Sequence, residues 1–218
     1  MGENLVTRRR ALALAAGTGA ALEVLAAAAL APASSSGASV IMLIRHAEKP
    51  TGSGAPHGVD AKGNHDKESL IVQGWQRAGA LVELFDPAVG KLRTGLTKPT
   101  ALFASNPGSH GSKRPLETIT PLAQRLNMTV STPVKASETE QIADILAATP
   151  GAPLAAWQHQ DIPAIAGHLK HVHPKPPTKW PGDRFDIVWV FTRRSDGSLK
   201  FAQVPQLLLA GDKHSVIK

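Results

Sequence analysis

Three short apolar runs stand out along the chain, and each of them ends in polar residues. They cover residues 40–44, 101–104 and 153–157. Apolar runs of this length, without alternating polar positions, are typical of strands buried on both faces of a parallel sheet. A weaker apolar stretch at residues 130–134 predicts a further strand.

The segments between these runs have the spacing of helices. Apolar residues recur at helical spacing from Leu70 to Phe85, and Pro115 is well suited to begin a second helix. Ser137 and Glu140 form a capping-box pattern that predicts a helix over residues 142–146, and a fourth helix is expected after Gln160.

The carboxyl-terminal part of the chain predicts a hairpin. Two apolar strands, ending at Phe191 and starting at Leu199, flank the turn residues Ser195–Gly197. Strands that alternate with helices, followed by a hairpin, indicate the α/β class. We therefore expect a three-layer α/β/α sandwich with a mainly parallel central sheet that ends in a β-hairpin.

Composition limits the classes of function. The chain has 218 residues, enough for one domain with a real core, and a formal net charge of +7 that suits an anionic ligand. It has no run of five basic residues and only 4% aromatic residues, which argues against a nucleic-acid-binding protein. The lack of cysteine excludes disulfides, thiol catalysis and cysteine-bound metals.

Residues 1–33 have the three parts of an export signal. Basic residues 8–10 precede an Ala/Leu-rich stretch, which ends in a small-residue motif at Ala33. The paired arginines after Thr7 resemble a twin-arginine signal, which implies the twin-arginine export machinery as a partner. We expect cleavage between Ala33 and Ala38 and a location in the periplasm, the cell envelope or the medium. The alternative is an uncleaved membrane anchor, which Glu23 disfavours.

Residues 34–218 are expected to form a single domain, and its candidate site lies where the apolar runs end. Arg45 and His46 follow the first run, Arg114 begins the helix after the second run, and His159 follows the third. Open α/β sheets bind ligands at the carboxyl ends of their strands. Arginine and a helix amino terminus favour anions, and histidine serves as nucleophile or acid/base. Each residue alone could be a solvated surface group, whereas the set predicts an anion pocket.

The same residues resemble a known family. Four motifs occur in the order seen in the histidine phosphatase superfamily, the phosphoglycerate-mutase-like proteins. They are the Arg45-His46 pair after the first strand, the helix sequence Gln73–Ala78, the Arg114…Thr118 spacing, and His159 before a helix. The resemblance covers residues 39–212 and is closest to small exported members. Arg77 departs from the residue that is common at its position.

The resemblance implies a metal-independent phosphomonoester hydrolase that needs no cofactor. His46 would be the nucleophile that forms a phosphohistidine, while Arg45, Arg114 and His159 would hold the phosphoryl oxygens. The partners would be a small phosphorylated substrate and inorganic phosphate. The alternative is a non-catalytic module of the same fold that binds phosphorylated ligands or other anions and lacks an effective general acid.

Two carboxylates are candidates for that general acid. Asp161 lies one residue beyond the position where one branch of the family has an aspartate directly after the second histidine. It could equally cap the helix that follows. Glu138 lies where another branch has its proton-donating glutamate, without the surrounding pattern. We place Asp161 ahead of Glu138.

Other histidines raise the question of a metal site. His57 and His65 lie in a loop rich in glycine, proline and aspartate that follows the first strand and could cover the pocket. His171 and His173 precede a proline-rich stretch. No carboxylate completes a ligand set near either pair, so we predict that these histidines are solvated and bind no metal.

Overall fold

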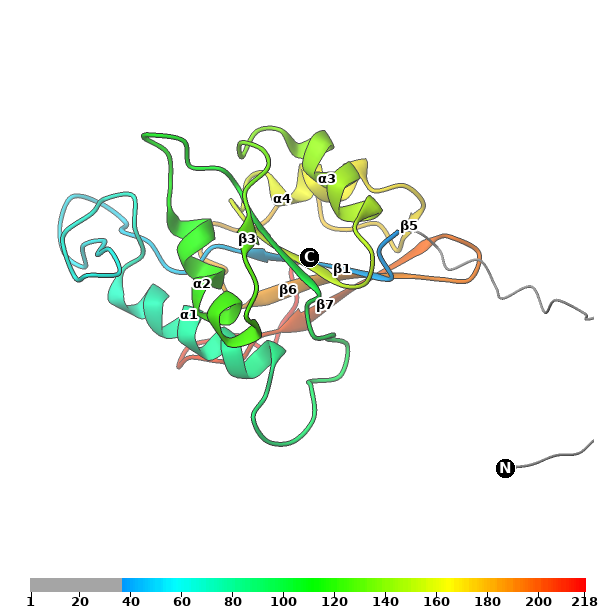
Figure 1. The fold of residues 1–218 in the computed structure, drawn as a ribbon, viewed down its shortest axis with the longest axis horizontal. Helices are drawn as coiled ribbons and strands as arrows, with labels where there is room; N and C mark the ends of the chain where they lie inside the picture. The colour runs from blue at the N-terminus through cyan, green and yellow to red at the C-terminus, as the bar shows by residue number, and fades with distance from the viewer. Residues whose placement is uncertain (1–36) are drawn as a thin grey trace, which may run out of the picture. The chain divides into compact units, whose positions relative to one another are not determined.

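The computed structural model describes residues 37–218 (Figure 1). The predicted export signal at residues 1–33 lies outside this part of the chain. Among the described residues, none of the helices has the length and apolar character needed to cross a membrane.

The centre of the fold is a mixed sheet with the strand order β3-β2-β4-β1-β6-β7-β5. The strands are β1 (Val40–Arg45), β2 (Ala101–Ala104), β3 (Val130–Ser131), β4 (Pro153–Trp157), β5 (Val172–His173), β6 (Ile187–Arg193) and β7 (Leu199–Pro205). β1, β4, β2 and β3 are mutually parallel. β6 pairs antiparallel with both β1 and β7, which confirms the predicted hairpin. The strand predicted at residues 130–134 is shorter than expected, because β3 has two residues rather than five. The short edge strand β5 was not predicted.

Within residues 37–218, four helices cover the two faces of this sheet (Figure 1): α1 (Val72–Phe85), α2 (Arg114–Leu126), α3 (Thr139–Ala148) and α4 (Ile162–His168). Successive side chains of β1 point to opposite faces. Met42 and Ile44 join one core cluster with residues of α1 and α2, while Ile41 and Leu43 join a second with residues of α3 and α4. The predicted α/β/α sandwich is therefore confirmed.

Two local features concern the starts of helices. A Cβ on Gly74 would lie 2.5 Å from the Glu48 carbonyl oxygen, so this glycine allows α1 to approach the end of β1 closely. The capping-box prediction is wrong, because α3 begins with Glu138 at its N-cap and has no side-chain cap. The Glu138 carboxylate instead accepts a hydrogen bond from the Lys135 N–H (2.7 Å), which closes the preceding turn.

The topology gathers four segments at one edge of the sheet. β1, β2 and β4 are parallel, so the residues that follow them emerge at the same edge. β6 is antiparallel to β1, so the segment before it, residues 180–186, also lies there. The candidate residues predicted from the strand ends therefore all follow strands that end at this edge of the sheet.

Candidate active site

His46 follows β1 directly and is almost completely buried, with 3% of its surface exposed. Its backbone N–H donates to the Trp157 carbonyl of β4 (2.9 Å), and its Nδ1 lies 2.8 Å from the carbonyl oxygen of Ala47. Because a carbonyl can only accept, Nδ1 carries the proton. The lone pair of the neutral ring is therefore on Nε2.

The environment of His46 keeps the ring neutral. Burial lowers its pKa to about 3, and the positive charges of Arg45, Arg114 and His159 act in the same direction. Arg45, Arg114 and His159, the other three residues predicted for the phosphate pocket, are thus all near enough to His46 to lower its pKa. A neutral imidazole with a free Nε2 is a competent nucleophile.

Arg45 is buried and only partly satisfied. Its Nη1 donates to the carbonyl oxygens of Gly182 (2.6 Å) and Arg184 (3.2 Å), and its Cζ lies 3.8 Å from the centre of the Phe185 ring. Its Nε and Nη2 are buried without a hydrogen-bond partner. Burial lowers its pKa to about 10, and the carboxylates of Glu48 and Asp183 oppose this shift. An anion that accepts from Nε and Nη2 would remove the cost of these unmet donors.

Arg114, the first residue of α2, is held by the loop that precedes α1. Its Nε donates to the Ser69 carbonyl (3.2 Å), its Nη1 to Ser112 Oγ (3.2 Å) and its Nη2 to the Lys67 carbonyl. The Glu68 carboxylate lies 3.8 Å from Nη2. A guanidinium has five N–H groups, so two remain for a ligand. Burial lowers the pKa of Arg114.

His159 lies two residues beyond β4, and its Nδ1 is buried without a partner. Burial lowers its pKa, with smaller contributions from the positive charges of Arg45 and Lys49. Lys49, which the sequence did not indicate, is thus near enough to His159 to affect its pKa.

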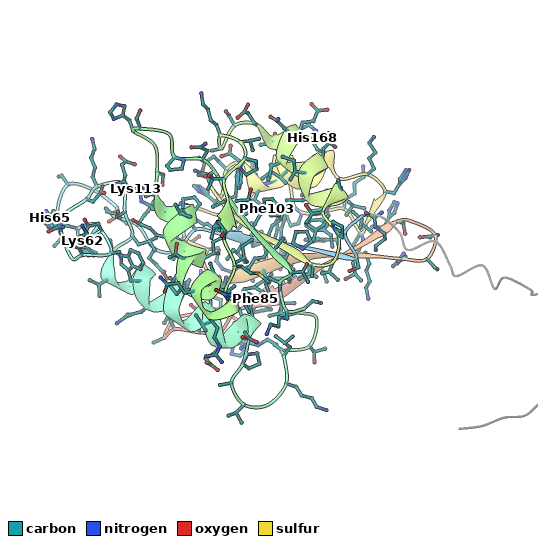
Figure 2. All side chains as sticks on the ribbon, viewed as in Figure 1. Lys62, His65, Phe85, Phe103, Lys113 and His168 are labelled. Carbon is teal, nitrogen blue, oxygen red and sulfur yellow. The ribbon has the colours of Figure 1, made fainter. Side chains whose placement is uncertain are left out.

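The two candidate acids have different surroundings. Asp161 is half-buried at the N-cap of α4, makes no side-chain cap, and has its pKa raised by burial. Glu138 is exposed, and it lines a surface pocket with Asp144 and His168. The Glu138 pocket lies at the end of α4, because it contains His168, the last residue of that helix (labelled in Figure 2). His159, in contrast, precedes the start of α4. Burial therefore biases the Asp161 carboxyl group toward its protonated form.

Arg77 is a buried residue whose role sequence reasoning missed. Its side chain is 3% exposed and contacts Glu48, Gln206 and Asp212. Its position in the helix could have indicated that it is buried, because Arg77 lies on the face of α1 that also buries Ala78 and Leu81. An unpaired charge is rarely tolerated there, so an arginine in that place indicates buried partners.

The segment that holds Arg45 was also missed. Trp180 Nε1 donates to the Arg184 carbonyl (2.9 Å), and Arg184 Nε donates to the buried Asp186 carboxylate (2.7 Å). These contacts fix the carbonyl groups that accept from Arg45.

Within residues 37–218, no group of three or more histidine, aspartate or glutamate side chains is arranged to hold a metal ion. The rings of His57 and His65 lie 4.3 Å apart, centre to centre, in the loop that follows β1. Figure 2 shows His65 on this loop together with Lys62.

Comparisons with known proteins give a similar chain path at low sequence identity. No family model and no curated protein matches the chain. Among solved structures, a mycobacterial glucosyl-3-phosphoglycerate phosphatase in complex with inorganic phosphate is 12% identical, with 76% of this chain and 95% of that chain covered and a TM-score of 0.44. YhfR from Bacillus stearothermophilus is 13% identical, with 80% and 97% covered and a TM-score of 0.39. Sequence identities and TM-scores this low do not show a shared function, so the function of this chain is inferred from its own residues.

Proposed function

We propose that this protein is a phosphomonoester hydrolase of the histidine phosphatase type, with His46 as the nucleophile. The observation that carries the proposal is the state of His46. Its Nδ1 lies 2.8 Å from the Ala47 carbonyl oxygen, which leaves Nε2 available, and its pKa is lowered to about 3 by burial and by Arg45, Arg114 and His159. A free nitrogen nucleophile among cationic donors suits attack on a phosphoryl group.

In the first step, Nε2 of His46 forms a bond to phosphorus as the bond to the ester oxygen breaks. Asp161 gives its proton to the departing oxygen, so an alcohol leaves. The phosphorylated imidazole is cationic, and the hydrogen bond from Nδ1–H to the Ala47 carbonyl stabilises it. Arg45 and Arg114 donate to the non-bridging oxygens, where negative charge is spread in the transition state.

In the second step, water attacks phosphorus and gives a proton to the Asp161 carboxylate. The N–P bond breaks, inorganic phosphate leaves, and His46 returns to its neutral form. The residues assigned here all act on the phosphoryl group or on the ester oxygen. We therefore infer that small phosphomonoesters with different alcohols are substrates, and that no metal is needed.

We also propose that residues 1–33 direct export by the twin-arginine route, which would place the reaction outside the cytoplasm. The twin-arginine-like basic head supports this proposal. Sequencing the amino terminus of the mature protein checks it, and a mature chain that still begins at Met1 would reject cleavage.

Replacement of the nucleophile tests the activity. His46→Ala should lower kcat/KM for an aryl phosphate by at least about 10³-fold, because no other group is placed to attack phosphorus. His168→Ala, at the distant end of α4, is the matched control and should keep the wild-type rate. Quenching without acid, followed by mass spectrometry, should locate the phosphoryl label on His46. Near-normal turnover by a folded His46→Ala protein would reject the mechanism.

The general acid is tested by changing the leaving group. Asp161→Asn should lower kcat/KM for an alkyl phosphate by about 10²-fold or more and affect kcat/KM for an aryl phosphate little, because this constant covers only the steps up to departure of the leaving group and a phenolate leaves without protonation. The Asp161 pKa is raised, so wild-type kcat/KM for the alkyl ester should fall as the pH rises through that pKa, and Asp161→Asn should lose this limb. Glu138→Gln is the control.

The non-catalytic alternative has its own outcome in this experiment. A wild-type protein that binds inorganic phosphate but hydrolyses neither ester would be an anion-binding module. If Glu138→Gln, rather than Asp161→Asn, removed alkyl turnover, the assignment of the acid would be wrong.

A further inference from the structure

A buried network of charged side chains joins the His46 turn to the carboxyl-terminal tail. Arg77 Nε donates to both carboxylate oxygens of Glu48 (2.9 and 3.1 Å), and its Nη2 donates to Glu48 Oε1 (2.8 Å). On its other side, Nη2 and Nη1 donate to Asp212 (2.7 and 3.1 Å), and Nη1 also donates to Gln206 (3.0 Å). The side chains of Arg77, Glu48 and Asp212 are 3%, 11% and 5% exposed.

Every N–H group of Arg77 has an acceptor within the protein. Nε has one N–H group, and each terminal nitrogen has two that match two different acceptors. Arg45 differs, because its Nε and Nη2 have no partner. Arg77 therefore holds protein segments together and does not bind the ligand.

Stability alone is a poor explanation for such a network. A buried ion pair loses about as much by desolvation as it gains by attraction, so apolar residues of similar volume are often at least as stabilising. A role in placing Glu48 is a better explanation, since Glu48 is two residues from His46 in the chain.

The backbone beside Glu48 is what orients the His46 ring. The Ala47 N–H donates to Thr118 Oγ1 (2.8 Å), and the Glu48 carbonyl accepts from the Ile71 N–H (3.1 Å). Between these contacts lies the peptide group that joins Ala47 to Glu48, whose oxygen accepts from Nδ1 of His46. The contact of the Glu48 side chain with Arg77 adds a further restraint at the Glu48 end of this peptide.

We propose that Arg77 is a positioning residue that, through Glu48, holds the Ala47 carbonyl where it keeps the proton of His46 on Nδ1 and the lone pair on Nε2. Asp212 and Gln206 hold the guanidinium from the other side, so the tail at residues 206–212 belongs to the scaffold of the active site. The inference rests on the proposed function, since it concerns the nucleophile of that reaction.

Kinetics of matched variants test the inference. Arg77→Met should lower kcat for an aryl phosphate by about 10²-fold, because a nucleophile displaced by 1 Å loses about that factor. KM should change less than about threefold, because the phosphate ligands remain. Arg125→Met removes a surface ion pair with Asp86 from the end of α2 and should leave both constants unchanged.

Conservative variants separate positioning from stability. Glu48→Gln and Asp212→Asn each weaken one side of Arg77, and both should lower the melting temperature. Only Glu48 adjoins the Ala47 peptide, so Glu48→Gln should lose at least about tenfold in kcat and Asp212→Asn clearly less. Equal loss of kcat in the two variants, or none in Glu48→Gln, would overturn the inference, even if Arg77→Met fails to fold.

A measurement on the ring itself needs no turnover. In wild-type protein, ¹⁵N NMR of labelled histidine should show His46 protonated on Nδ1, and Glu48→Gln should show a mixture with the Nε2-protonated form. A Glu48→Gln protein that keeps the pure Nδ1 form would also overturn the inference. An inactive wild-type protein that shows these tautomers would reject the proposed function and leave the positioning role standing.

Discussion

The two candidate phosphate-binding arginines are held in different ways. Arg45, at the end of β1, is 1% exposed, and only its Nη1 is hydrogen-bonded. Arg114, at the start of α2, is more exposed, and all three of its nitrogens donate to neighbouring residues. Arg45 thus has buried N–H groups without an acceptor, whereas Arg114 uses several of its N–H groups to bind a neighbouring loop.

If the proposed site binds a phosphoryl group, the difference implies that the two arginines contribute to binding in different ways. The desolvation of Arg45 has already occurred on folding, so a phosphoryl group gains the full benefit of its free donors. Arg114 would bind an anion with its two remaining N–H groups while its other donors hold the carbonyl oxygens of Lys67 and Ser69. Glu117 of α2 anchors the same loop, because it accepts from Ser69 Oγ (2.6 Å) and the Leu70 N–H (2.9 Å). The Arg114 side of the pocket is thus coupled to the loop.

The same substitution at both sites should have unequal effects. Lysine keeps the charge but cannot provide a forked set of donors. Arg45→Lys should lower kcat/KM by about 10²–10³-fold, since one ammonium cannot serve both the Gly182 carbonyl and the phosphoryl oxygens. Arg114→Lys should cost about tenfold. Steady-state kinetics with an aryl phosphate measures both, and equal losses would contradict the comparison.

Hydrogen exchange of backbone amides distinguishes the same two variants by their effect on the loop before α1. Arg114→Lys should speed the exchange of backbone amides in residues 59–70, because two loop carbonyls lose a donor. Arg45→Lys should leave this loop protected. Unchanged exchange in Arg114→Lys would show that the loop is held without it.

A smaller effect should appear in the pH dependence of stability. The pKa of folded His46 is about 3, against an ordinary value of 6.5, so between these values the unfolded chain binds a proton that the folded chain does not. The free energy of unfolding should therefore fall as the pH falls from about 6.5 to 3. Urea unfolding at several pH values should show a shallower slope for His46→Ala than for His168→Ala. Identical slopes would reject the burial of a neutral His46.

The sequence alone determined the layers of the fold and the position of the proposed nucleophile. Buried parallel strands and amphipathic helices are local patterns, so the strand at residues 40–44 and the helix ending at Phe85 could be located without tertiary information. Because parallel strands end at a common edge, the order of Arg45, His46, Arg114 and His159 was enough to predict that they meet.

Only the tertiary structure decided how that pocket is held. Arg77 meets Asp212 across 135 residues of sequence, and Arg45 meets the Gly182 carbonyl across 137. No periodicity encodes such pairs, because they depend on how the tail and the segment before β6 return to the end of β1. Burial likewise distinguishes Asp161 from Glu138, and burial is a property of packed neighbours rather than of the local sequence.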